Sequence, residues 1–449
     1  MRKTLAILIA LLTFQMGFAN FPITLSGTIE NHKKSELTLH GLNFEKKLST
    51  NAEAKFKETF DIPYAGTYQL VIGKNAIKLY LDKNSKLNLV SNADFTKEAV
   101  FTGEGNLENK YLVAKEKNPN SMKDMQQLFS KSEADFNTQI TSDVSYVENL
   151  LKNAKITNKK FLDLEKKHLL AYQQYMYTNY EPAHQYFSKN EAFKVSNSFD
   201  SHIALTDFDD ADLFVYSNFY QKIAADNYSA KDGQLETAEG INAYFSKIKG
   251  LKNTYLTQNI VKNSSYELRA GNPNNKILLD QLTSMTTDAA LKADLNKKYE
   301  TFEKLKAGTK APNFNFENLK GGTTTLESMK GKFVYIDIWA TWCGPCLQEV
   351  PSMKALEEKM HGKNIEFVSI SIDELKSKDK WKNMIEKKEM KGVQLFADNA
   401  WQSQFVADWG VDSIPRFLLI DPQGNIVNAD APRPSDPALE TLLVSLGVK

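Results

Sequence analysis

The two cysteines of the chain are separated by only two residues, in the sequence Trp342-Cys343-Gly344-Pro345-Cys346. Two thiols at this spacing lie close enough to join in a disulfide, and the thiolate form attacks the disulfides of other molecules. Three other interpretations are open. A zinc site needs four ligands, and the chain has no second cysteine pair. A structural disulfide across so short a loop restrains little of the unfolded chain, and the pair could also be an inert part of a core. The residue types and their spacing favour a dithiol/disulfide redox centre over all three.

The cysteines lie between a predicted buried strand and a predicted helix. Phe333 to Ile338 is rich in Val, Ile, Tyr and Phe and is interrupted by one acid, Asp337. From Leu347 to Met360, apolar residues recur on one helical face. Cys343 would therefore lie at a helix N-terminus, where free N–H groups and the helix dipole favour a thiolate. Pro345 is tolerated in the first turn because its missing N–H would have no helical partner.

This region resembles the thioredoxin superfamily, because WCGPC follows a strand of the type VYIDIWAT. Glu349 within CLQEVP, the segment Ala311-Pro312-Asn313-Phe314 and the later Ile414-Pro415 resemble its TlpA/ResA-like periplasmic branch. The resemblance extends from about Gly308 to Lys449, the last third of the chain. It implies a C-terminal α/β thioredoxin fold with a central mixed sheet. It also implies a thiol–disulfide oxidoreductase, for which we expect no cofactor and no metal.

The two cysteines are expected to have different roles. Cys343 attacks a substrate disulfide and forms a mixed disulfide, which Cys346 then resolves. Asp337 lies six residues before Cys343, where the thioredoxin family keeps a buried acid. Because burial raises the pKa of a carboxyl, Asp337 is predicted to take the proton that Cys346 must lose. The alternative is a strand acid whose carboxylate reaches solvent.

Three further site residues follow from the resemblance. Glu349 lies three residues after Cys346, one helical turn further on, and matches an acid that this branch places near the active site. The alternative for Glu349 is a solvated carboxylate on the helix surface. Trp342 is expected to shield the sulfurs. The Ile414–Pro415 bond is expected to be cis and to face the cysteines, which leaves Pro415 beside a backbone edge for an extended substrate segment.

Residues 1–19 have the pattern of a secretory signal peptide. Arg2 and Lys3 precede an apolar run from Leu5 to Leu12, and we expect cleavage after Ala19. The apolar run is too short for a good membrane span, and no cysteine follows the cleavage position to carry a lipid anchor. The chain is therefore predicted to be periplasmic, without stable membrane insertion. An exported protein with one CxxC pair and no other cysteine uses that pair for chemistry.

The rest of the chain is predicted to be multidomain. Residues 20–105 contain short alternating apolar and polar segments between turn residues, typical of an antiparallel β-sandwich, and resemble the small β-domain ahead of many TlpA-like proteins. Residues 106–306 change to a helical period and should form an α-helical domain. Residues 307–449 should form the thioredoxin-like redox domain.

The most direct interpretation is a periplasmic reductase of protein disulfides. Gly-Pro between the cysteines and Ile414 before the proline resemble the reducing thioredoxins. The resemblance implies a protein disulfide substrate, with apocytochrome c as one class, and a membrane electron-donor protein as partner. The 56 basic and 55 acidic residues nearly cancel, which argues against nucleic-acid binding. A disulfide oxidase or isomerase, a thiol peroxidase, and a binding protein whose first two domains capture a partner remain alternatives.

Overall fold

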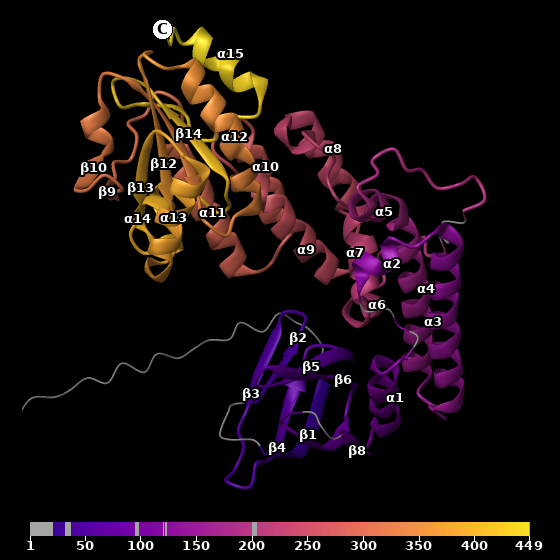
Figure 1. The fold of residues 1–449 in the computed structure, drawn as a ribbon. Coiled ribbons are helices and arrows are strands. Elements are labelled where there is room, and N and C mark those ends of the chain that lie inside the picture. Colours follow the sequence, from indigo (N-terminus) through magenta and orange to yellow (C-terminus); the bar gives the residue numbers. More distant parts are fainter. Residues whose placement is uncertain are drawn as a thin grey trace, which may run out of the picture. The chain divides into compact units, whose positions relative to one another are not determined.

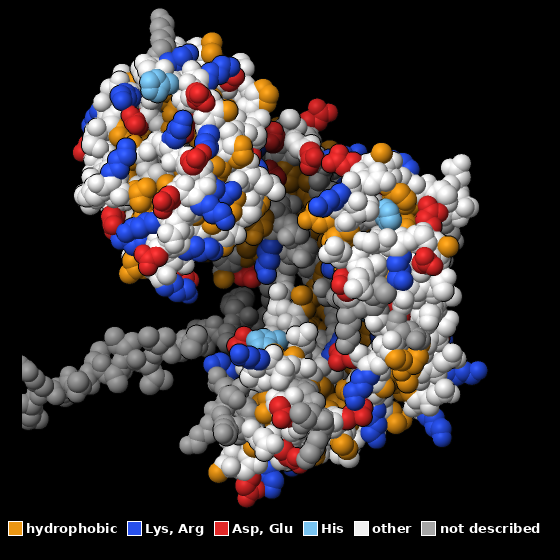
Figure 2. Space-filling model, in the orientation of Figure 1, with side chains coloured by type: hydrophobic (Ala, Val, Ile, Leu, Met, Phe, Trp, Pro, Cys, Tyr) orange, Lys and Arg blue, Asp and Glu red, His pale blue; other side chains and the backbone are white. Residues whose placement is uncertain are grey.

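The computed structural model describes residues 21–31, 37–94, 98–119, 121, 124–199 and 204–448 (Figure 1). The predicted signal peptide, residues 1–19, lies outside the described residues. The chain folds into two compact units: residues up to Ser229 with Gly250–Ile260, and Ala230–Lys249 with Val261–Lys449. Among the described residues, no helix has both the length and the hydrophobicity needed to traverse a bilayer. On the face drawn in Figure 2, basic and acidic side chains are interspersed.

The first unit begins with two four-stranded sheets, counted over the described residues. One has the order β4(Lys55–Ile62), β1(Phe21–Glu30), β7(Lys86–Asn92), β8(Val100–Gly103), and the other β3(Phe44–Leu48), β2(Leu37–Gly41), β5(Gly66–Ile72), β6(Asn75–Leu81). Alternate side chains from both sheets form one apolar cluster, which includes Leu25, Leu39 and Leu70. This burial explains the period-two sequence pattern.

The strand pairing differs from the fully antiparallel arrangement expected. β1 and β7 are parallel, with Leu25 opposite Leu87, while the other pairs in these two sheets are antiparallel. A parallel pair needs a long crossover connection. Here the chain between the two strands provides it by passing through the second sheet, which no local alternation of residues reveals.

Helices follow the sheets, and polar side chains cap many of them. The helices before residue 230 are α1(Asn106–Glu116), α2(Met125–Phe129), α3(Glu133–Asn153), α4(Lys159–Thr178), α5(Tyr180–Ser188), α6(Ala211–Tyr216) and α7(Asn218–Asn227). Those after it are α8(Ala238–Ile248), α9(Thr254–Ser264), α10(Asn275–Ser284) and α11(Ala289–Lys304), with the short 3-10 helix η1(Gln234–Glu236) before α8. Ser132, Asn158 and Asp288 accept backbone N–H bonds at the starts of α3, α4 and α11, which is why those helices begin there.

The two units do not follow the expected division at residues 105/106 and 306/307. The β-sheets share a unit with α1 to α7, and α8, α10 and α11 share a unit with the redox part of the chain. The physical reason for the second grouping is a set of ion pairs and apolar contacts from α11 and the loop before α10 to residues 410–430.

The redox part is built on a mixed sheet, as expected for a thioredoxin-like fold. Its order is β10(Thr323–Thr325), β9(Asn315–Asn318), β13(Val393–Phe396), β12(Ile365–Ser371), β11(Phe333–Trp339), β14(Arg416–Ile420), β15(Ile426–Asn428). β11, β12 and β13 are parallel, and the remaining pairs are antiparallel. The helices are α12(Gly344–Lys359), α13(Lys378–Lys388), α14(Gln404–Asp408) and α15(Pro437–Ser445). Every residue of β11 is buried, and side chains of α12 and α15 pack against one face of its sheet.

Candidate active site

Cys343 and Cys346 lie at the junction of β11 and α12, where the sequence predicted them. A disulfide joins them, and their side chains are 4% and 3% exposed. Cys343 is the N-cap residue of α12, and the N–H of Cys346 points at its Sγ from 3.2 Å. In the reduced protein the same N–H and the helix dipole would stabilise a thiolate on Cys343.

A buried carboxylate that the sequence interpretation missed holds the segment before the cysteines. Asp373 is 1% exposed and accepts hydrogen bonds from the N–H and the Oγ–H of Thr341, both at 2.8 Å. It also accepts from the hydroxyl of Ser371 at 2.8 Å. The sequence did contain a signal that could have identified Asp373. Parallel strands end at the same sheet edge, so an acid just after β12 should lie beside the residues that follow β11. Asp373 therefore fixes the backbone two residues before Cys343.

Asp337 is a buried acid in the middle of the site's central strand. It lies on β11 between Ser369 of β12 and Phe417 of β14, and it is 7% exposed. Burial, together with the nearby negative charges of Glu349 and Glu357, raises its pKa from 3.8 to about 8. The alternative of a solvent-reaching carboxylate is excluded. A carboxyl with this pKa is close to the ordinary thiol value of about 8.5, so it is suited to exchange a proton with a cysteine.

Glu349 is likewise buried rather than solvated on the helix surface. It is 8% exposed, and its two carboxylate oxygens accept hydrogen bonds from the N–H and hydroxyl of Ser435 at 3.0 and 2.9 Å. The guanidinium of Arg433 lies 3.9 Å away. Glu349 thus connects α12 to the loop before α15, and its negative charge acts on Asp337.

A third acid of this group, Glu357, was not predicted. It lies two turns beyond Glu349 on α12, at the i+8 spacing that keeps residues on one side of a helix. Burial raises its pKa from 4.5 to about 7, against the opposing charges of Lys391 and Lys354. Its Oε2 atom is buried and lacks a hydrogen-bond partner among the described residues. Two carboxyls of raised pKa, Asp337 and Glu357, therefore occur in this part of the domain.

Trp342 is largely exposed, so its side chain does not cover the sulfurs completely. It is 55% exposed, and its ring centroid lies 6.4 Å from that of Trp401. Both tryptophans line a pocket of about 840 Å³, together with Phe316, Leu375 and Phe396. The sequence interpretation did not include Trp401 in the site. A recess lined by both apolar and polar residues thus adjoins the residue before Cys343.

The Ile414–Pro415 bond is cis, as the resemblance implied. Arg416 follows immediately as the first residue of β14 and lies opposite Ile338 of β11. Because β11 continues toward Cys343 from that point, this register places Pro415 beside the segment that leads to the cysteines. Pro415 is only partly buried.

Comparisons with known proteins match the part of the chain that carries this site. A family model described as Redoxin matches residues 306–443. Thiol-disulfide oxidoreductase ResA of Bacillus cereus is 32% identical over 125 residues, which cover 28% of this chain and 69% of that protein. The protein of the same name from Bacillus subtilis (strain 168) is 30% identical over 125 residues, 28% of this chain and 67% of that protein. The thioredoxin domain of a thiol-disulfide oxidoreductase from Bacteroides vulgatus is 26% identical, covering 32% of this chain and 99% of that chain with a TM-score of 0.30.

Proposed function

Because the chain belongs to the ResA-like thiol–disulfide oxidoreductases of the thioredoxin superfamily, we propose that it reduces the disulfides of exported proteins in the periplasm. The observation that carries this proposal is a cysteine pair at a helix N-terminus, in the same buried region as an acid whose pKa is raised to about 8. The helix end favours a thiolate, and the acid is suited to accept a thiol proton.

The proposed reaction transfers two electrons from the reduced pair to the substrate. The Cys343 thiolate attacks a substrate disulfide, forms a mixed disulfide and releases one substrate sulfur as a thiolate, which takes a proton from water. Asp337 accepts the proton of Cys346. The Cys346 thiolate then attacks the Cys343 sulfur, releasing the second substrate thiolate and leaving the Cys343–Cys346 disulfide. A membrane electron-donor protein returns two electrons to this disulfide for the next turnover.

Substrate recognition is proposed to use the segment around Pro415. An extended substrate segment pairs with the backbone edge before β14, which brings its disulfide to Cys343. The predicted signal peptide, residues 1–19, supports the periplasmic location. Exported proteins, with apocytochrome c as one class, are the proposed substrates.

The reduction potential tests the direction of the reaction. The protein is equilibrated with mixtures of reduced and oxidised glutathione, and the dithiol fraction is counted by alkylation and intact mass. We expect a potential well below that of strong oxidants, because a reductase must favour its own disulfide over that of its substrate. A potential near about −120 mV, the range of the strongly oxidising periplasmic enzymes, would assign the chain to disulfide formation instead.

A further inference from the structure

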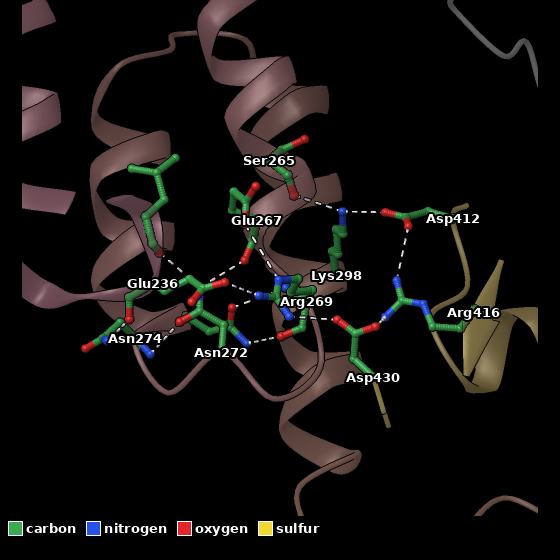
Figure 3. Close-up of polar contacts among 12 residues, drawn as sticks. Glu236, Ser265, Glu267, Arg269, Asn272, Asn274, Lys298, Asp412, Arg416 and Asp430 are labelled. Carbon is green, nitrogen blue, oxygen red and sulfur yellow. Dashed lines mark hydrogen bonds and ion pairs between the residues drawn. The ribbon is translucent and has the colours of Figure 1, made fainter. Parts of the chain in front are cut away.

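The loop that carries the cis-proline, Val411–Arg416, is contacted by α11 and, through Asp430, by the loop before α10, and both of these segments precede the thioredoxin-like domain in the chain (Figure 3). Lys298 of α11 places its Nζ 2.6 Å from an oxygen of Asp412 in this loop. The same ammonium donates to the backbone oxygen of Ser265 at 2.8 Å, which fixes it between the helical segment and the loop. The Lys298 side chain is only 18% exposed, so solvent screens this ion pair less than an exposed one.

A second contact reaches the other end of the loop. Arg416, next to Pro415, has a side chain 9% exposed, with its guanidinium 3.0 Å from Asp430 and 3.6 Å from Asp412. The other oxygen of Asp430 accepts a hydrogen bond from Arg269 at 2.7 Å. Charges therefore alternate along one connected set, Lys298, Asp412, Arg416, Asp430 and Arg269, which we call the ion-pair chain (Figure 3).

Arg269 is itself fixed in position before it reaches Asp430. Its guanidinium also pairs with Glu236, the last residue of η1. Its backbone N–H and carbonyl both bond the side chain of Asn275, at 3.3 and 2.9 Å. Because Arg269 is already fixed by these partners, it loses little side-chain freedom when it binds Asp430. It therefore holds Asp430 in a defined place and also supplies a positive charge.

Apolar packing brings α11 against the start of the loop. Gly410 has φ +57, and a Cβ built on it would lie 2.7 Å from the ring of Phe302. Phe302 is 3% exposed and lies one turn beyond Lys298 on α11. The helix therefore touches the chain just before the cis-proline loop and pairs with the loop through Lys298.

We propose that Lys298 and Arg269 are positioning residues for the thiol–disulfide reaction. They hold the cis-proline loop at the place where a substrate segment pairs, so recognition of extended substrates depends on residues that precede the thioredoxin-like domain in the chain. The cysteines have a separate support, because Asp373 fixes Thr341 without any member of the ion-pair chain. The ion-pair chain therefore affects the binding of extended substrates but not the rate at which Cys343 attacks a disulfide. This inference rests on the proposed function.

The test uses the full-length protein and two disulfides that differ in size. Insulin requires the substrate edge, whereas dithiobis(nitrobenzoate) is too small to pair with it. Lys298→Met is expected to raise KM for insulin by about 5-fold while kcat stays within about twofold, the pattern of lost uniform binding. Its rate with dithiobis(nitrobenzoate) should stay within about twofold, and Lys298→Arg should restore KM because it keeps the cation. The matched control is Lys297→Met, on the same helix and exposed, for which the described residues show no ion pair.

Two further variants test the same role at other members of the ion-pair chain. Arg269→Met removes the other end of the ion-pair chain and should give the same selective rise in KM. Asp412→Asn removes the partner of Lys298 from the loop side, and combined with Lys298→Met it should add little to either single change. Unchanged KM in all of these variants, an equal loss with both disulfides, or failure of Lys298→Arg to rescue would overturn the positioning role. Wild-type protein that reduces neither disulfide would instead overturn the proposed function.

Discussion

Replacing Asp337 by asparagine should change how the stability of the redox domain depends on pH. In the unfolded chain this carboxyl titrates near its ordinary pKa of 3.8, whereas in the folded protein burial raises the pKa to about 8. Between these values the unfolded state binds fewer protons than the folded state, so the free energy of unfolding falls as the pH rises. The contribution of Asp337 changes by about 1.4 kcal/mol per pH unit in this range. The total is on the order of 5 kcal/mol, an upper limit because small rearrangements lower the cost of a buried charge.

Tryptophan fluorescence makes this measurement specific to the redox domain. All five tryptophans of the chain lie between residues 339 and 409, so their emission reports unfolding of that domain alone. Urea unfolding of the oxidised protein is followed at intervals from pH 5 to pH 9. Asp337→Asn should exceed the stability of the wild type by only about 1–2 kcal/mol near pH 5 and by several kcal/mol at pH 9, because the neutral amide carries no charge to desolvate.

The matched control is Glu358→Gln, an exposed acid on α12. It should leave the pH dependence of the wild type unchanged. Parallel stability curves for wild type and Asp337→Asn across this pH range would refute the reasoning, since they would mean that Asp337 ionises in the folded protein near its ordinary pKa. Glu357 provides an internal check, because its pKa, raised to about 7, leaves a residual slope in the Asp337→Asn variant.

Three other outcomes are expected. Cys343→Ser should abolish insulin reduction. Cys346→Ser should accumulate a mixed disulfide through Cys343, which is seen as added mass that dithiothreitol removes. If iodoacetamide labels Cys346 of the reduced protein faster than Cys343, the two roles are reversed. Glu349→Gln removes a charge that raises the pKa of Asp337, so the pH profile of Cys343 alkylation should move to lower pH; an unchanged profile would make Glu349 purely structural. Asp373→Asn leaves the bonds of Thr341 only partly satisfied and should cost about 1–3 kcal/mol in urea unfolding; a loss below about 0.5 kcal/mol would contradict that anchoring.

The local elements of the site could be read from the sequence. A run of β-branched and aromatic residues gave β11, the helical period gave α12, and both cysteines lie at their junction. The mixed sheet of the redox domain was also predicted, because strands that alternate with helices return in the same direction. These features depend on residues near one another in the chain, so short-range patterns encode them.

The contacts between distant segments could not be read in this way. Ser435 lies 86 residues from the Glu349 it bonds, and Lys298 lies 114 residues from the Asp412 it pairs with. From the sequence, Glu349 and Lys298 could each be an ordinary solvated side chain on a helix surface. No periodicity in the sequence distinguishes a solvated side chain from one that is buried and paired with a distant residue. The parallel pairing of β1 with β7 and the inclusion of α11 in the redox unit were missed for the same reason.

The sequence by itself therefore determined which residues are the candidates for the reaction: a CxxC pair at the start of a helix, with an acid on the preceding strand. The tertiary structure alone decided how those residues are tuned and held. Burial between β12 and β14 gives Asp337 its raised pKa, Asp373 fixes the backbone before Cys343, and Lys298 of α11 pairs with Asp412 in the cis-proline loop. Reactivity is a property of residue types and local spacing, whereas pKa and position depend on desolvation and on partners that only the folded chain brings together.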